Sequence, residues 1–358
     1  MTKTDNLKMI AALSNARGTS GFEEEVVSVI EPFVSGLGEV WTDSMKNLYV
    51  SRNGNADGCP MVQLDAHTDE VGFMVQAVRP DGNLRIVPLG GWVASNVPAG
   101  KVLVRNTVGE YIPGITTSKP PHFMTEEEQK SPLDIKSIMV DIGARSAEDA
   151  IKNYGIRIGE PIVPDADFFH WKQNDLLVGK AFDCRLGCAA VIRTLTELKD
   201  RKLKVNVTGA FAVQEEVGTR GAAVTAQTVK PDVAIVFEGC PADDTCVEPY
   251  MVQTALGKGP MLRHMDQGMI THPEFQRYAL RLAEELEIPV QEGVRDLGAT
   301  NGRSIHLTGN GVPTIVIGIP VRYAHTHYGI SAYADYEYAV RLAEELIVRL
   351  DKDCIRHL

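Results

Sequence analysis

The sequence predicts an α/β fold, in which a mainly parallel sheet flanked by helices is accompanied by a smaller β-rich unit. Beyond about residue 164, strand-like and helix-like segments alternate, the pattern of a parallel sheet with crossover helices. Residues 73–163 are instead a succession of strand-like segments separated by turns. At 358 residues the chain exceeds the roughly 250 to 300 residues at which single cores stop growing. We therefore expect two domains, or one domain with a large insertion.

The first 67 residues contain two predicted helices and two segments with strand character. Helices are expected over residues 6–17 and 22–36, the second with Glu23, Glu24 and Glu25 in its first turn, where negative charge favours the helix dipole. Strand character follows in residues 40–52 and 61–67.

Residues 73–163 predict a small all-β unit. Its strand-like pieces include FMVQAV, LRIVPL, KVLVRN, EYIPGI and SIMVDIG, with turn residues between them. Residues 118–134 combine prolines with charge and little apolar content, which predicts a mobile loop.

The second half of the chain predicts the parallel sheet and its helices. Apolar positions near i, i+3, i+4 and i+7 indicate the helices, and short apolar runs indicate the strands. The expected order is helix 185–200, strand 205–213, a Gly-rich turn and helix, strand 232–238, helix 274–287, strand 314–320 and a closing helix over 336–351.

Composition excludes several classes of protein. Hydrophobic residues at 44% and charged residues at 23% argue against disorder and coiled coil. The formal charge of −11 has the wrong sign for neutralising a phosphate backbone, so nucleic acid is not expected as a partner. No apolar run approaches the roughly 20 residues of a membrane span, and the run Met9–Leu13 is too short for a signal-peptide core. Six cysteines without CxxC spacing predict reduced thiols, so we expect a cytoplasmic protein that does not bind membranes.

Histidine and carboxylate side chains fall at the ends of strands, or directly before a helix, in five separate segments. In open α/β sheets, ligands bind in the crevice at the carboxyl ends of the strands. Taken singly, each residue has an ordinary structural explanation as a hydrogen-bonded histidine, a helix-capping Asp or a solvated Glu. Their coincidence at one edge favours a metal site. The candidates are His67, Asp183, Glu215, Glu216, Glu238 and His325.

Two of these segments have sequence patterns that side-chain packing alone does not explain. In DAHTDEVGFMV (residues 65–75), Asp69 follows His67 at a spacing that suits a metal-bound imidazole oriented by a carboxylate. In AVQEEVGTRGA (residues 212–222), adjacent carboxylates end a strand at a turn, so that both can face one site. One of them can then bind a metal while the other moves a proton, as metal-assisted hydrolysis requires.

The chain resembles the M42 family of metallo-aminopeptidases, the glutamyl and tetrahedral aminopeptidase group, nearly from end to end. The resemblance rests on specific motifs in which ligand, base and spacing agree. These are SGFEEEVV, DAHTDEVGFMV, GGW at 90–92, YGIRIGEPIVPD, KAFDCRLGC, VQEEVGTRGA, NGRSIHLTGNGVPT and PVRYAHTHYGI.

The resemblance implies a site with two divalent metal ions, Zn²⁺ or Co²⁺ first and Mn²⁺ as a further option. It assigns His67 and Glu238 to one ion and Glu216 and His325 to the other. Asp183 would bridge both, Glu215 would be the general base and Asp69 would stand behind His67. The family also implies a cis peptide at Asp183–Cys184. Two positions depart from its pattern, because Glu238 and Asn301 stand where many members have Asp.

For architecture, the resemblance implies a zinc-peptidase α/β domain of the phosphorylase/hydrolase-like type, formed by residues 1–72 and 164–358. Residues 73–163 would be an inserted, β-barrel-like dimerisation domain, and dimers would build a tetrahedral dodecamer. Cys184 and Cys188 are expected to be small, buried apolar residues rather than metal ligands.

The predicted function is hydrolysis of the N-terminal residue of short peptides by a metal-bridged water, with Glu215 as general base. Two alternatives remain at this point. One is a two-metal deacylase of small N-acyl amides, and the other is a catalytically silent assembly protein of the same fold. No substrate-binding residue, and so no side-chain preference, follows from the sequence.

Overall fold

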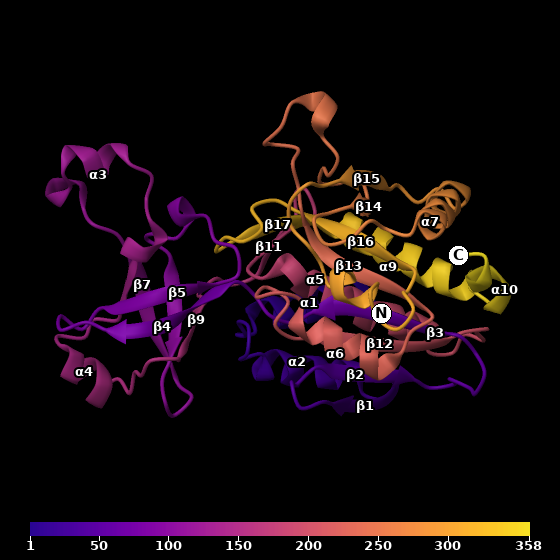
Figure 1. The fold of residues 1–358 in the computed structure, drawn as a ribbon, viewed down its shortest axis with the longest axis horizontal. Coiled ribbons are helices and arrows are strands. Elements are labelled where there is room, and N and C mark those ends of the chain that lie inside the picture. The colour runs from indigo at the N-terminus through magenta and orange to yellow at the C-terminus, as the bar shows by residue number, and fades with distance from the viewer.

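The computed structural model describes residues 1–358 and confirms the predicted α/β fold (Figure 1). A large α/β unit holds both chain termini, and a smaller barrel lies to one side of it. No helix is both long and apolar enough to cross a lipid bilayer.

An eight-stranded sheet forms the centre of the α/β unit. Four of its seven neighbouring pairs are parallel, and the antiparallel pairs lie toward the two edges. In spatial order the strands are β1 (Gly38–Thr42), β2 (Leu48–Arg52), β12 (Asn206–Ala212), β3 (Met61–His67), β13 (Val233–Pro241), β16 (Thr314–Val321), β14 (Met261–Met265) and β15 (Gln291–Val294).

Helices cover both faces of this sheet, which is why its central strands are apolar on both sides. In β13, Ile235 and Phe237 belong to one core cluster while Ala234 and Val236 belong to another. The larger cluster is closed by α1 (Lys3–Asn15), α2 (Glu24–Val34), α5 (Phe182–Leu198), α7 (Pro273–Glu285) and α9 (Tyr333–Arg349). The smaller is closed by α6 (Arg220–Val229) and α8 (Gly302–Ile305), and α10 (Lys352–Arg356) ends the chain.

A closed six-stranded barrel occupies the stretch in which the sequence predicts a β-rich unit. Its hydrophobic core is separate from those of the α/β unit and includes Phe73, Val104 and Ile162. Around the barrel the order is β4 (Gly72–Val78), β5 (Leu84–Leu89), β8 (Met139–Asp141), β7 (Tyr111–Thr117), β6 (Lys101–Arg105) and β9 (Pro161–Pro164). The short helices α3 (Glu126–Lys130) and α4 (Ala147–Lys152) lie outside it.

Several elements differ from the sequence prediction. The predicted loop 118–134 contains α3, whose N-terminus is held by a capping box between Thr125 and Glu128. The segment 40–52 is two strands joined by a turn. The predicted helices are displaced by up to three residues, and the short strands β14 and β15 were not predicted. A small sheet of β10 (Phe169–Trp171), β11 (Leu176–Gly179) and β17 (Gly329–Ala332) was also missed.

Candidate metal centre and active site

The site lies where the central parallel strands end. Paired residues show that β3 and β12 end together, because Ala212 lies beside His67. On the other side of β3, Glu238 of β13 lies beside Gly318 of β16, and His325 follows β16. Asp183 lies in the first turn of α5, where the backbone departs from helical geometry, and the Asp183–Cys184 peptide is cis, as the family resemblance implies.

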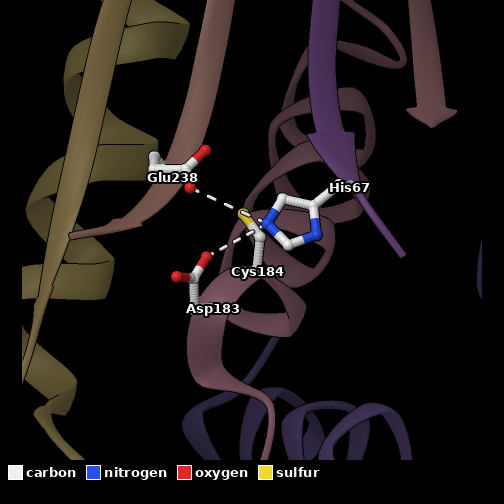
Figure 2. A group of neighbouring side chains, drawn as sticks. All are labelled: His67, Asp183, Cys184 and Glu238. Carbon is white, nitrogen blue, oxygen red and sulfur yellow. Dashed lines mark hydrogen bonds and ion pairs between the residues drawn. The ribbon is translucent and has the colours of Figure 1, made fainter. Parts of the chain in front are cut away.

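A first cluster joins His67, Asp183 and Glu238 (Figure 2). The Nε2 atom of His67 lies 3.0 Å from Asp183 Oδ1 and 3.7 Å from Glu238 Oε1. The sulfur of Cys184 also lies within 4.8 Å of these ligand atoms, but its thiol donates to the main-chain carbonyl of Phe237 at 3.2 Å. Burial raises the pKa of this thiol well above its usual value, which agrees with a neutral, buried Cys184.

A second cluster joins Asp183, Glu216 and His325. The Nε2 atom of His325 lies 3.2 Å from Asp183 Oδ2 and 3.4 Å from Glu216 Oε2. Asp183 therefore presents one carboxylate oxygen to each cluster. This is the arrangement that a carboxylate shared between two cations requires.

The two clusters fit divalent cations. Donor atoms bound at about 2.1 Å to one tetrahedral zinc ion lie roughly 3.4 Å apart, and the N···O distances here are 3.0 to 3.7 Å. Glu216 Oε1 and Glu238 Oε2 are buried without any hydrogen-bond partner. Buried carboxylates without partners are costly unless a cation compensates them. Imidazole and carboxylate donors suit Zn²⁺ and Co²⁺.

The electrostatics of the clusters point the same way. Burial raises the pKa of Glu238 to about 8, and the negative charge of Asp183 adds to this rise. Burial alone would lower the pKa of His67, but its contacts with Asp183, Asp69 and Glu238 outweigh burial and raise that pKa well above its usual value. The concentrated negative charge thus attracts positive charge into the site, from either protons or metal ions.

Glu215 belongs to neither cluster. It is buried, and no hydrogen bond or ion pair engages its carboxylate. Burial raises its pKa well above the usual value, and the nearby carboxylates add to this effect while His67 opposes it. Glu215 lines a cavity of about 660 Å³ together with Asp183, Glu216, Glu238 and His325. Glu215 therefore faces the same cavity as both clusters, and no side chain engages its carboxylate.

Asp69 has more contacts than the sequence suggests. The Nδ1 atom of His67 lies 3.1 Å from the main-chain oxygen of Asp69 and 3.3 Å from its Oδ1, so either can orient the ring. The Asp69 carboxylate also accepts the main-chain N–H groups of Glu215 and Glu216, at 2.9 and 3.1 Å. The hydroxyl of Ser20 donates to Asp69 Oδ2 at 2.6 Å. Asp69 therefore connects the first cluster to the turn that carries both glutamates.

The glycines that follow β5 also support the site, a role that sequence reasoning missed. The main-chain oxygen of Gly91 lies 2.9 Å from His325 Nδ1 and accepts its proton when Nε2 faces the carboxylates. Gly90 has a φ of +85°, and a Cβ atom there would lie 2.6 Å from the Val71 side chain and 2.9 Å from Glu216 Oε2. The sequence motif GGW marks these two glycines, but their contacts with the site can be seen only in the folded structure. The indole of Trp92 packs on Phe73 and donates to the Gly72 carbonyl, as a core residue does.

A buried arginine fixes the loop that follows β3. Arg185 donates to four main-chain carbonyls, of which that of Thr68 is next to His67. The other three belong to the loop after α1 and its last turn, at Leu13, Ala16 and Gly18. Beside it, Lys180 forms a fully buried ion pair with Glu70. These contacts anchor residues 67–70 to the N-terminal segment.

Asn301 takes part in a buried hydrogen-bond network with Asp65. Its Nδ2 donates to Asp65 Oδ1 at 2.6 Å, and Asn301 is fully buried. Asn301 is not among the residues that line the cavity, so it does not contact a molecule held there.

The α/β sheet, the two clusters that share Asp183 and the separate Glu215 carboxylate are the arrangement expected of a metal-dependent hydrolase. Comparison with known proteins places it further. A sequence profile described as M42 glutamyl aminopeptidase matches residues 46–342. The glutamyl aminopeptidase of Lactococcus lactis subsp. cremoris is 31% identical over 352 residues, covering 98% of each chain.

Two solved structures agree with this match. The TET aminopeptidase of a marine sediment Thaumarchaeota archaeon has a TM-score of 0.94 and 35% identity, with 99% of each chain covered. The Pyrococcus horikoshii TET1 peptidase, described as able to assemble into a tetrahedron or a large octahedral shell, has a TM-score of 0.85 and 27% identity, covering 96% of this chain and all of its own. The chain belongs to the M42 family of aminopeptidases. It is a metal-dependent aminopeptidase, a hydrolase of the exopeptidase type.

Proposed function

We propose that this aminopeptidase removes the N-terminal residue of short peptides at a dinuclear centre, with Glu215 as general base. The observation that carries the proposal is the pair of clusters sharing Asp183, with the Glu215 carboxylate beside both and engaged by neither. His67 and Glu238 would hold one ion, and Glu216 and His325 the other.

The reaction needs two contributions. When bound, the ions supply Lewis acidity, which makes water more acidic and polarises the peptide carbonyl. Glu215 takes a proton from the attacking water and returns it to the nitrogen of the leaving amine. Asp69 holds the main-chain N–H groups of Glu215 and Glu216, so the base keeps its direction during both transfers. Gly91 and Asp69 hold the outer nitrogens of His325 and His67 in the same way.

Zn²⁺ or Co²⁺ is the proposed native metal, with Mn²⁺ as a further option. Two nitrogen and three carboxylate donors, without a required thiolate, support this choice. We also propose a cytoplasmic location, which the six free cysteines support.

Self-association through the barrel is proposed as well, with residues 1–72 and 164–358 as the catalytic domain and 73–163 as the dimerisation domain. Large apolar side chains in the loops of residues 73–163 are exposed, including Val108 at 76%, Phe123 at 73% and Ile158 at 71%. The related TET1 peptidase, described as a dodecamer in one structure and as able to form a tetrahedron in another, supports the proposal that dimers of this chain build a dodecamer. Light scattering at micromolar concentration should give a particle far above 39 kDa, and a monomer would contradict the proposal.

A panel of aminoacyl anilides tests the function. The chelated protein should be inactive and should regain activity with Zn²⁺, Co²⁺ or Mn²⁺. Anilides with a free α-amine should be cleaved and their N-acetyl forms should not. Cleavage of the N-acetyl forms alone would indicate the deacylase instead, and a protein that binds no metal would indicate the silent assembly protein.

A further inference from the structure

The turn that carries Glu215 and Glu216 is held by side chains rather than by the sheet. Strand β12 ends at Ala212, and each of the next four main-chain N–H groups donates to a side-chain oxygen. These acceptors come from three segments that are far apart in the sequence. The pairs are Val213 to Asn47 Oδ1 at 2.9 Å, Gln214 to Glu23 Oε1 at 2.9 Å, Glu215 to Asp69 Oδ1 at 2.9 Å and Glu216 to Asp69 Oδ2 at 3.1 Å.

Among these acceptors, Glu23 is a buried carboxylate that neither forms an ion pair nor caps a helix. It is only 3% exposed, and no Lys, Arg or His forms an ion pair with it. It precedes α2, yet its side chain does not cap that helix. Its Oε1 accepts two main-chain N–H groups, those of Gly21 and Gln214, each at 2.9 Å. A buried carboxylate without a cationic partner is costly, and these two bonds offset part of that cost.

Gln214 needs such a contact because its backbone is strained. Its φ of +56° lies in the left-handed region, which non-glycine residues adopt only where their surroundings hold them. The bond from Gln214 N–H to Glu23 fixes this residue immediately before Glu215. A change at Gln214 would therefore redirect the Glu215 side chain in the cavity.

We infer that Glu23 is a positioning residue for catalysis: its carboxylate fixes Gln214, and through it the direction of the general base Glu215. The inference rests on the proposed function for its catalytic consequence. It assigns to the motif SGFEEEVV, which lies in the N-terminal segment, a part in the active site. What matters in this role is the reach of the Glu23 oxygen, since either a carboxylate or an amide oxygen can accept an N–H group.

Two conservative variants separate reach from charge in the full-length, metal-loaded protein. Glu23→Gln keeps the length of the side chain and an acceptor oxygen but removes the charge. Glu23→Asp keeps the charge but shortens the side chain, so that it can no longer reach Gly21 and Gln214 together. Glu24→Asp is the matched control, because Glu24 is the exposed neighbour in the first turn of α2 and its side chain forms no hydrogen bond or ion pair.

Three quantities are measured: kcat and KM on an aminoacyl anilide, bound metal per chain, and amide hydrogen exchange of the segment 213–219. Glu23→Asp should lower kcat about 10- to 100-fold with KM within about twofold, unchanged metal content and faster exchange in 213–219. Glu23→Gln should keep at least about a third of the wild-type kcat. Glu24→Asp should match the wild type in all three.

The inference is overturned if Glu23→Asp keeps kcat within about twofold of the wild type, or if exchange in 213–219 is unchanged. It is also overturned if Glu23→Gln loses as much kcat as Glu23→Asp, or if the loss of kcat is matched by loss of metal. Should Glu23→Asp fail to fold, the same criteria apply to Glu23→Ala, which also withdraws the acceptor from Gln214 but leaves no buried charge. If the wild type cleaves no anilide, the proposed function fails, while the exchange measurement still shows whether Glu23 holds the turn.

Discussion

Replacing Asp69 by Asn tests how the first cluster is coupled to the turn of Glu215 and Glu216. In the wild type the two carboxylate oxygens accept both main-chain N–H groups of the turn. In Asp69→Asn one of these oxygens becomes an NH₂ group. An NH₂ group cannot accept a hydrogen bond, so the main-chain N–H group that faces it loses its acceptor. The hydroxyl of Ser20 can rotate to adapt, but the main-chain N–H cannot.

The expected cost is that of one buried, unpaired N–H group, about 1–3 kcal/mol. If this cost falls on the position of Glu215, kcat decreases about 5- to 150-fold, since about 1.4 kcal/mol is a factor of ten in rate. The assay is kcat at saturating anilide, together with bound metal per chain. Asp69→Asn should retain its metal, because the main-chain oxygen of Asp69 still lies 3.1 Å from His67 Nδ1. A variant with wild-type kcat, or one that loses kcat only in proportion to lost metal, would refute this reasoning.

Three further predictions concern the surroundings of the site. Gly90→Ala should lower the metal content and reduce kcat at least about tenfold, because the added Cβ would crowd Val71 and Glu216. Gly109 has a similar positive φ but open space around it, so Gly109→Ala should lower stability alone. Equal activity of the two variants would contradict this prediction. Arg185→Lys should lower the free energy of unfolding by about 3 kcal/mol or more, because an ammonium group cannot reach four carbonyls. Arg201 is exposed, so Arg201→Lys should change the free energy of unfolding by less than about 0.5 kcal/mol. Urea midpoints at constant slope measure both changes. Removing the metal should lower Tm by about 10–20 °C. Each of the two ions, at about a hundredfold excess over its Kd, contributes about 2.7 kcal/mol, and Tm of a large domain shifts by about 2–4 °C per kcal/mol. An unchanged Tm after chelation would show that the carboxylates need no cation.

Much of the fold could be predicted because the central strands and helices are long and strongly patterned. Strands such as β3 and β13 are mostly apolar and buried along their length, with His67 as the last residue of β3 and Glu238 in the last half of β13, and α9 has a clear helical period. Short edge elements were missed for a physical reason, since β15 has four residues and is stabilised by its neighbour β14 rather than by its own pattern. Helix α3 did carry a signal, the Thr125–Glu128 capping box, but the surrounding prolines and charges favoured a loop.

The site divides in the same way. The six candidate side chains could be predicted to meet, because the carboxyl ends of parallel strands share one edge and each candidate lies near the end of such a strand or begins α5. Apart from Asp69, which follows His67 by two residues, their supports could not be predicted, because they depend on contacts across long separations. Glu23 reaches a main-chain group 191 residues away, and Gly91 reaches His325 across 234 residues. Main-chain acceptors such as the oxygen of Gly91 leave no trace in residue type.

The Glu215→Gln variant tests the central claim most directly, namely that two ions are held by five other side chains while Glu215 moves the proton. Gln has nearly the same shape and relieves the repulsion from the neighbouring carboxylates, so folding should be unaffected. The variant should bind the same number of metal ions per chain as the wild type, and kcat should decrease about 10²- to 10⁴-fold with little change in KM. A variant that turns over at nearly the wild-type rate, or one that has lost a metal ion, would contradict the assignment.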